Sequence, residues 1–289
     1  MRIWCLVSNV DSHVRKYGKA LLGQREDKGY EVVFLDYASL EIRTGEATPA
    51  FYCMGERLEL PDAFWVWTSN TDTRVVENVL LACGAQSIVN LHEQDVARSK
   101  IATYHRLAAA GIRVPRTFVF FNHVEREQIL EQFAYPFVIK PDNGSSGQGV
   151  ALIGDDAELD AYLADLKPGV AYMAQEYVAT SRGRDLRVVM LDGECLMSFV
   201  RQSTDEKEFR SNLHLGGKIV DFEPDEPTKE LCRRVAALYD LPVLGLDLMF
   251  AKDGFVLTEV NSYPGLRKAD RDTFISSVIN DYVKRHEEA

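Results

Sequence analysis

The sequence contains no long apolar run, and this absence excludes one class of protein. None of its 289 residues belongs to an apolar stretch near the ~20 residues that a membrane-spanning helix needs. The run Ile3–Val7 is too short for the apolar region of a secretory signal, and the polar residues Asn9 and Asp11 follow closely. We therefore expect no membrane segment and no membrane partner.

Cysteine is scarce, and its few positions show no disulfide or metal-binding pattern. The five cysteines include no C-x-x-C pair and no histidine at ligand spacing: Cys5, Cys53, Cys83, Cys195 and Cys232. An odd, scattered set favours free thiols in a reducing compartment. We expect a cytoplasmic protein in which these thiols are ordinary packing residues.

Positive charge is also in deficit. Lys and Arg total 33 against 44 Asp and Glu, which leaves a net charge of −11 at pH 7. An acidic chain is a poor sequence-independent binder of nucleic acid, so we expect no nucleic-acid partner. The composition is 46% hydrophobic and 27% charged, an ordinary globular mixture that argues against a disordered chain.

The order of the apolar segments predicts an open α/β domain at the N-terminus, followed by two further regions of which the last is richer in strands. Apolar strands at residues 3–7 and 31–36 flank a segment with helical spacing at residues 11–28, which predicts a β-α-β unit. A helix is expected over residues 95–110, and strands with short turns become more frequent later. We expect three domains, which comprise residues 1–87, residues 88–175 and residues 176–289.

A glycine- and serine-rich segment, Gly144–Gly149, lies between two predicted strands. It lacks the Lys-Ser/Thr pair of a Walker A loop, and the strand that follows it excludes the dinucleotide fingerprint, which opens a helix. Such a turn can direct backbone N–H groups at an anion, and Lys140 before it adds a positive charge. Phosphate binding and a plain hairpin tip beside a surface lysine both stay open from these residues alone.

A predicted hairpin near the C-terminus carries Asp247 on one strand and Glu259 and Asn261 on the other. A two-residue turn would place Asp247 opposite Val260, whereas a three-residue turn over residues 252–254 places it opposite Glu259. We expect the three-residue turn, because it gathers the apolar residues of both strands on the other face.

Two directly opposed carboxylates destabilise a sheet, and a divalent cation between them removes that conflict. Asp247, Glu259 and Asn261 offer two carboxylates and an amide oxygen, an all-oxygen set that suits Mg²⁺. The alternative is that one carboxylate pairs with an arginine while the other lies at a solvated edge.

A polar cluster lies between these two motifs. Arg210, Ser211 and Asn212 precede a pair of glycines, and such a cluster can hold phosphate or a developing oxyanion. His214 lies between two leucines, which is more typical of a packed residue than of a general base.

These motifs, in this order, resemble the ATP-grasp superfamily and in particular its RimK-type glutamate ligase branch. The resemblance covers residues 88–286 well and the first domain in outline. Its closest stretches are Gln175–Val178, Gly183–Arg187, Phe209–His214, Gly245–Asp247 and Thr258–Leu266.

The resemblance implies that two α+β subdomains clasp ATP. It implies phosphate contacts from Lys100, Lys140 and the loop residues Ser145 and Ser146. It also implies an adenine contact at Glu176 and Tyr177, a ribose contact at Asp185, a phosphate and acyl-phosphate site at Arg210, Ser211 and Asn212, and two Mg²⁺ ions (or Mn²⁺) on Asp247, Glu259 and Asn261.

The family reaction transfers the γ-phosphoryl group of ATP to a carboxylate, and an amine then displaces phosphate to give an amide. Arg210 and Lys140 are the expected catalytic residues, and the glycine loop is the expected lid. A kinase that stops at phosphoryl transfer and a non-catalytic ATP-binding module are the two alternatives.

The substrates implied are a small carboxylic acid and an amine, or a peptide terminus. Arg187, Arg201 and Arg267 are candidate carboxylate clamps. The sequence departs from the branch at residues 67–70 and 202–208 and at Tyr263, so the acid and the amine stay open. The resemblance also implies a homo-oligomer, either a dimer or a tetramer.

Overall fold

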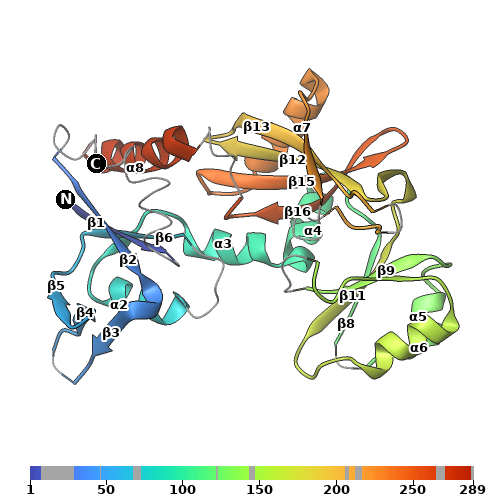
Figure 1. Ribbon diagram of the computed structural model, residues 1–289, viewed down its shortest axis with the longest axis horizontal. Helices are drawn as coiled ribbons and strands as arrows, with labels where there is room; N and C mark the ends of the chain where they lie inside the picture. Colours follow the sequence, from blue (N-terminus) through green and yellow to red (C-terminus); the bar gives the residue numbers. More distant parts are fainter. Residues whose placement is uncertain are drawn as a thin grey trace. The chain divides into compact units, whose positions relative to one another are not determined.

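The computed structural model describes most of the chain, and its contacts divide it into two compact units (Figure 1). The described residues are 1–7, 29–45, 47–67, 73–121, 123–142, 147–205, 208–211, 217–264 and 271–287. The first unit comprises Met1–Leu91 with Tyr263–Ala289, and the second comprises His92–Ser262. The three predicted domains stay a prediction, and the predicted helix over residues 11–28 lies outside the described residues.

The first unit is built on a parallel sheet in the order β2-β1-β6-β7. Its strands are β1 (Arg2–Val7), β2 (Glu31–Asp36), β6 (Ala63–Trp67) and β7 (Gln86–Ser87). Apolar residues fill β1 and β6, which agrees with burial on both faces. The predicted α/β character of the N-terminal region is therefore confirmed.

A small antiparallel sheet, a short 3-10 helix and two α-helices complete the described part of the first unit. The sheet has the order β3-β4-β5, and Phe51 from it packs edge to face on Trp4 of β1, at 5.4 Å between ring centroids. The strands of this sheet are β3 (Leu40–Arg43), β4 (Ala50–Cys53) and β5 (Glu56–Leu58), and the helices are the short η1 (Tyr37–Ser39), α2 (Thr73–Ala82) and the closing α8 (Arg271–Glu287).

Helix α8 belongs to the first unit although the chain reaches it last. Tyr30 donates a hydrogen bond to Asn280 Oδ1 at 3.1 Å, and Tyr282 donates one to Gln86 Oε1 at 3.1 Å. Two of the departures noted in the sequence also meet in this unit, where Trp67 and Tyr263 contact edge to face at 6.0 Å between ring centroids.

The second unit contains two antiparallel sheets, of which the first has the order β10-β9-β11-β8. Helices α5 and α6 cover one face of it, where Ile129 and Leu159 pack with Phe137 and Ile139 in one apolar cluster (Figure 1). These elements are β8 (Thr117–Phe121), α5 (Arg126–Leu130), β9 (Phe137–Pro141), β10 (Ala151–Ile153), α6 (Asp156–Ala164) and β11 (Ala171–Glu176).

The other sheet has five strands in the order β14-β13-β12-β15-β16. Its elements, with the helices beside it, are α3 (Leu91–Arg98), α4 (Lys100–Ala109), η2 (Ala179–Ser181), β12 (Arg184–Leu191), β13 (Glu194–Gln202), β14 (Lys218–Asp221), α7 (Glu226–Ala236), β15 (Val243–Ala251) and β16 (Gly254–Asn261). Strands β3 and β14 were not anticipated from the sequence.

The five-stranded sheet has one apolar and one charged face, because side chains alternate along a strand. Leu186, Val188 and Leu246 lie in the same apolar cluster as Cys232 of α7 and Leu107 of α4. Arg187 of β12 and Asp247 of β15 alternate with these residues and face the other way. This second face forms one wall of the site described below.

The single helix expected over residues 95–110 is two helices, α3 and α4, which meet at Ser99. Ser99 has an extended backbone (φ −85°, ψ 116°), and its side chain accepts a hydrogen bond from Ala102 N. The same hydroxyl donates to Asp142 Oδ2 at 2.9 Å. A helix N-cap held by a distant carboxylate therefore interrupts a continuous helical pattern.

The hairpin of β15 and β16 has the predicted pairing at its acidic end, but its turn differs from the expected one. Asp247 lies opposite Glu259 as expected, whereas Ala251 pairs with Gly254, so the three-residue turn was wrong and the turn has two residues. A register shift after Asp247 leaves Thr258 as an extra residue on β16. Without the extra residue, the two-residue turn would place Asp247 opposite Thr258; the bulge shifts the register by one residue and places Asp247 opposite Glu259.

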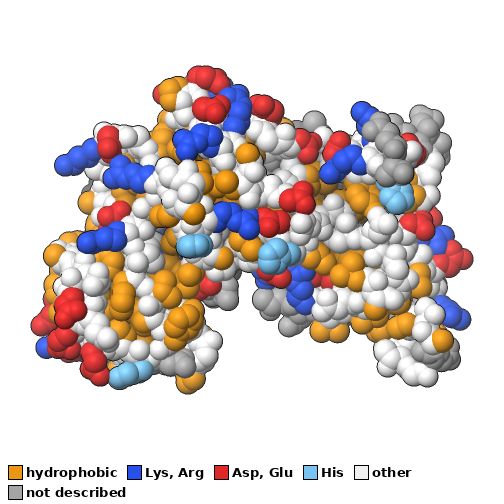
Figure 2. Space-filling view, turned by 180° about the vertical axis from the view of Figure 1, so that it is seen from behind, with side chains coloured by type: hydrophobic (Ala, Val, Ile, Leu, Met, Phe, Trp, Pro, Cys, Tyr) orange, Lys and Arg blue, Asp and Glu red, His pale blue; other side chains and the backbone are white. Residues whose placement is uncertain are grey.

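The surface of the described residues carries mixed charge, and Figure 2 shows acidic and basic side chains interspersed over the face that it draws. Among the described helices, none combines the length and the apolar character that crossing a membrane requires.

Candidate active site

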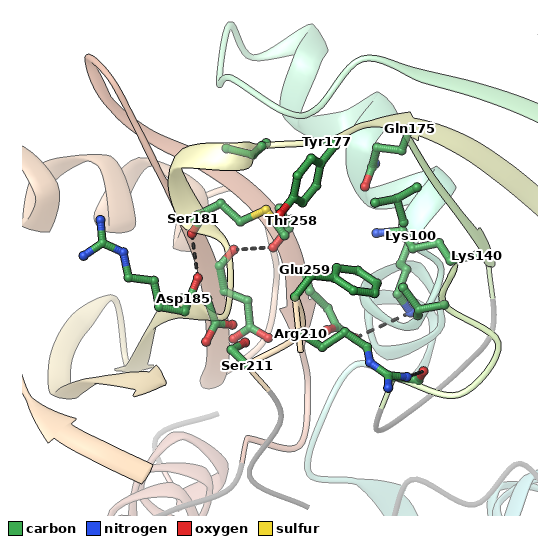
Figure 3. A pocket seen from close by; sticks show the side chains of 18 of the residues that line it. Lys100, Lys140, Gln175, Tyr177, Ser181, Asp185, Arg210, Ser211, Thr258 and Glu259 are labelled. Atoms are coloured by element: carbon green, nitrogen blue, oxygen red, sulfur yellow. Dashed lines mark hydrogen bonds and ion pairs between the residues drawn. The ribbon is translucent and has the colours of Figure 1, made fainter. Parts of the chain in front are cut away.

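A cavity that is partly open to solvent lies in the second unit. Both sheets of the unit and helix α4 contribute to it (Figure 3). Most of the described residues that the sequence singled out line this cavity: Lys100, Lys140, Glu176, Tyr177, Asp185, Arg201, Arg210, Ser211, Asp247 and Glu259. Elements separated by more than a hundred residues thus bring one set of predicted side chains together.

Lys100 begins helix α4 and points into the cavity. Its Nζ donates to the carbonyl of Asp142 at 3.2 Å and lies 3.6 Å from Glu259 Oε1. The Asp142 carboxylate accepts from Ser99 and from the backbone N–H of Ile101 at 2.9 Å each. The N-cap interactions of α4 therefore hold the backbone from which the Lys100 side chain extends.

Lys140 is at the end of β9 and is buried, with 8% of its surface exposed. Its Nζ donates to the hydroxyl of Tyr104 at 3.0 Å. Burial lowers the pKa of Lys140 to about 8, while the negative charges of Glu259 and Asp142 oppose the shift. Figure 3 shows Lys100 and Lys140 on the same side of the cavity.

Arg210 lies in a described segment between β13 and β14. Its guanidinium group forms a bidentate pair with Glu208, at 2.8 and 2.7 Å, and donates to the carbonyl of Gly147 at 3.1 Å. The hydrogen bond from Arg210 holds the pKa of Glu208 below its usual range. Gly183 has a φ of +67°, and a Cβ there would lie 3.2 Å from the carbonyl oxygen of Glu208, so a larger residue would be both strained and crowded beneath this segment.

A more apolar part of the cavity lies around the end of β11. Glu176 ends that strand and Tyr177 follows it, and the Tyr177 ring contacts Phe209 edge to face at 6.3 Å. The apolar residues lining the cavity are Val138, Val150, Val178, Phe209 and Met249. Apolar walls beside a few polar groups are typical of sites for flat organic ligands.

Charged residues form a ladder across the inner face of the five-stranded sheet. Arg201 lies opposite Asp185, and Arg187 lies opposite Asp247, each on neighbouring strands. Arg187 binds Asp247 with two nitrogens, one of them 2.8 Å from Oδ2, and Arg201 reaches the same oxygen at 2.8 Å. Arg201 also binds Asp185 with two nitrogens, through Nε at 2.9 Å.

The electrostatics of this ladder favour charged Asp247. The residue is 3% exposed, and burial alone would raise its pKa. The charges and hydrogen bonds of Arg187 and Arg201 outweigh burial and hold the pKa of Asp247 below its usual range. For Arg201, burial acts to lower the pKa, but Asp247 and Asp185 raise it above the ordinary value.

The predicted metal-ligand set fits an oxygen-preferring cation in its chemistry, with one complication. Asp247 and Glu259 lie opposite each other, and Asn261, which carries an amide oxygen, lies two residues after Glu259 on the same strand. However, two guanidinium groups already occupy the Asp247 carboxylate, which is the arginine pairing held open as the alternative. Among the described residues, no cluster of three His, Cys, Asp or Glu side chains is arranged to hold a metal.

Some predicted residues lie elsewhere or outside the described part of the chain. Arg187 and Asn261 are described but are not among the residues that line the cavity. The residues outside the described ranges are Ser145, Ser146, Asn212, His214 and Arg267. Tyr104, Thr258 and Glu208 were not predicted as site residues. The contacts of Tyr104 join distant elements and Thr258 is the bulged residue, whereas Glu208 could have been suspected from its place two residues before Arg210.

Comparison with known proteins identifies the family. The RimK-like ATP-grasp domain matches residues 97–280, well over half of the chain. The chain therefore belongs to the RimK-like ATP-grasp family, as the resemblance of its motifs predicted.

Two curated relatives indicate how close this membership is. The chain is 32% identical over 191 residues to N-acetylaspartylglutamate synthase A of Homo sapiens, which is 64% of this chain and 49% of that protein. It is 34% identical over 172 residues to a probable alpha-L-glutamate ligase of Xanthomonas oryzae pv. oryzae, which is 59% of this chain and 58% of that one. The chain thus spans about half of the length of these relatives.

Solved structures support the fold across the whole chain. A RimK domain ATP-grasp protein from Sphaerobacter thermophilus has a TM-score of 0.72 at 20% identity, and the match covers 98% of this chain and 99% of that one. The expected ATP-grasp architecture after an N-terminal α/β region is confirmed.

Proposed function

We propose that this chain is an ATP-dependent carboxylate–amine ligase that forms an amide bond through an acyl phosphate. One observation carries the proposal: a single cavity holds Lys100, Lys140 and Arg210 together with the opposed carboxylates Asp247 and Glu259. Phosphoryl transfer needs positioning and charge neutralisation more than covalent chemistry from the protein. Membership of the RimK-like ATP-grasp family supports the same function.

The cavity offers a place for each part of ATP. The apolar end near Glu176 and Tyr177 suits the adenine ring, and Asp185 suits a ribose hydroxyl. A carboxylate has about four lone-pair sites, so Asp185 can accept from ribose while it keeps Arg201. The phosphates then extend toward Lys100 and Lys140, with Ser145, Ser146, Ser211 and Asn212 as further proposed contacts.

Two Mg²⁺ ions, or Mn²⁺ ions in their place, would be held by Asp247, Glu259 and Asn261. When bound, the cation neutralises charge on the transferred phosphoryl group. Arg187 and Arg201 keep Asp247 charged, which is the form that a cation requires. Arg201 and the undescribed Arg267 remain the proposed clamps for a substrate carboxylate, whereas Arg187 is paired with Asp247 and does not line the cavity, which favours a structural role for it.

The proposed chemistry proceeds in two balanced steps. A carboxylate oxygen of the acid attacks the γ-phosphorus atom, and the bond to the β-γ bridging oxygen breaks to release ADP. The amine then attacks the acyl carbon, phosphate leaves with the bonding electron pair, and the amine proton passes to solvent. Arg210 and Lys140 would balance the charge that builds on the phosphoryl group and on the acyl phosphate.

The relatives suggest where to begin the search for substrates. Their names refer to N-acetylaspartylglutamate and to glutamate, so glutamate is the first amine to test, with small acids and peptide termini as acceptors. A cytoplasmic location and a homo-oligomer remain part of this proposal.

Hydroxylamine can replace the unknown amine in a direct test. The protein is incubated with ATP, Mg²⁺ and a pool of amino acids, small acids and dipeptides, and hydroxamates are identified by mass spectrometry. ATP-dependent hydroxamate from at least one carboxylate supports the ligase. A stable phosphorylated product without hydroxamate would identify a kinase instead, and ATP binding without turnover would identify a binding module.

A further inference from the structure

The hydroxyl group of Tyr104 joins three elements around the cavity without lining it. Tyr104 lies on α4 and is 5% exposed. Its hydroxyl accepts a hydrogen bond from Lys140 Nζ on β9 at 3.0 Å and bonds to the carbonyl of Thr258 on β16 at 2.7 Å.

Simple chemistry fixes the direction of these hydrogen bonds. The Thr258 carbonyl can only accept, so the single proton of the Tyr104 hydroxyl points to it. An oxygen lone pair is then left to accept from Lys140. The buried hydroxyl therefore donates one hydrogen bond and accepts another, and phenylalanine could do neither.

Both main partners of Tyr104 belong to the proposed reaction site. Lys140 is the buried lysine of the four-stranded sheet, while Thr258 is the bulged residue directly before Glu259 on the five-stranded sheet. Thr258 also donates from Oγ1 to the carbonyl of Asp247 at 3.1 Å. The Tyr104 hydroxyl therefore connects Lys140 on one wall of the cavity to the backbone of Thr258, the residue before Glu259, on the other wall.

We infer that Tyr104 is a positioning residue, which orients the Lys140 ammonium group toward a bound nucleotide and fixes it relative to Glu259. The inference rests on the proposed function, because it requires a nucleotide in this cavity. Tyr104 acts through Lys140 and through the Thr258 bulge and needs no contact with substrate. Without the hydroxyl, the ammonium group loses its acceptor, and the Thr258 carbonyl is left buried without its donor.

Tyr104→Phe tests this role, because phenylalanine keeps the ring packing and removes only the hydroxyl. We expect its Kd for ADP to rise about fivefold, equivalent to about 1 kcal/mol, as measured by calorimetry with and without Mg²⁺. Tyr239→Phe is the matched control. Tyr239 is also buried, and its hydroxyl bonds to Thr103, the neighbour of Tyr104 on α4, at 3.3 Å. The control should leave ADP affinity unchanged.

A double-mutant cycle separates positioning from general destabilisation. If Tyr104 acts through Lys140, Tyr104→Phe should change ADP affinity by less than about twofold in a Lys140→Met background. An equal loss in both backgrounds, or an equal loss in Tyr239→Phe, would overturn the inference. Unchanged ADP affinity in Tyr104→Phe would overturn it as well, with the proposed function intact. Failure of the unmodified chain to bind ADP or ATP would overturn both.

Discussion

Arg187 and Asp247 lie opposite each other on strands β12 and β15, and their side chains form a buried ion pair. Arg201 adds a second guanidinium group to the same carboxylate. In the proposed enzyme, Asp247 therefore has two functions: it is a cation ligand and it balances two buried arginines. Glu259 across the hairpin pairs only weakly, at 3.6 Å from Lys100, and its side chain is 34% exposed.

The two carboxylates should respond differently to neutralisation. Asp247→Asn leaves two buried arginines without their countercharge, so we expect turnover to fall by at least about 100-fold and the free energy of unfolding to fall by about 3 kcal/mol. Glu259→Gln should lower turnover to a similar extent, but its free energy of unfolding should fall by less than about 1 kcal/mol. Urea unfolding and hydroxamate formation measure these effects. If both variants lost the same free energy of unfolding, the greater burial of Asp247 would not explain its contribution to stability.

Nucleotide affinity should depend on the charge of Lys140. Its pKa of about 8 means that the ammonium group loses its proton between pH 7 and pH 9, whereas phosphate groups with a second pKa of about 6 remain ionised. We expect ADP affinity to fall about fivefold over this interval, measured by calorimetry. Lys140→Met should bind weakly and without this pH dependence. The same dependence in the variant would exclude Lys140 as its source.

Lys140 should have the opposite effect on the stability of the nucleotide-free protein. Its pKa is lowered in the folded state, so above pH 8 the unfolded chain holds more protons at this residue. The contribution of Lys140 to the free energy of unfolding therefore rises between pH 8 and its ordinary pKa. Urea unfolding of the unmodified chain and of Lys140→Met, compared at pH 7 and pH 9, measures this. A contribution that falls with pH would contradict the burial of a charged lysine.

The pairing of Arg210 with Glu208 should compete with phosphate binding. Glu208→Gln weakens this bidentate pair and leaves the guanidinium group more available to an anion. We expect ADP to bind about threefold more tightly, with a steeper dependence on salt. Glu226→Gln is the matched control, because Glu226 pairs with Arg233 on α7 and does not line the cavity. Unchanged affinity in Glu208→Gln would mean that Arg210 does not contact the phosphates.

The cap of α4 should matter for binding as well as for stability. Ser99→Ala removes the N-cap and the bond to Asp142, so we expect the free energy of unfolding to fall by about 1 kcal/mol and ADP affinity to fall through Lys100. Asp225→Ala removes the cap of α7 and is the control. It should lower the urea midpoint without a change in ADP affinity. A parallel loss of affinity in both variants would show that the effect is not local to Lys100.

Much of the fold could be predicted because its signals are local. Strands β1, β2 and β6 of the first sheet follow from apolar runs, whereas the two-residue strand β7 (Gln86–Ser87) was not predicted, and the β12–β13 hairpin follows from its Asp192-Gly193 turn. The register of Asp247 and Glu259 was predicted correctly, but through the wrong turn. The bulge at Thr258 could not be anticipated, because its stabilising partner, Tyr104, is 154 residues away in sequence.

The sequence by itself determined the family, the strands that carry the charged residues, and the residue types that suit ATP chemistry. These depend on side-chain alternation, on turn residues and on motif order, all of which are written along the chain. Only the tertiary structure decided that Arg187 and Arg201 share Asp247 and that Tyr104 connects Lys140 to β16. Such contacts join separate strands and helices, and their partners are set by packing and by the need to satisfy buried charge.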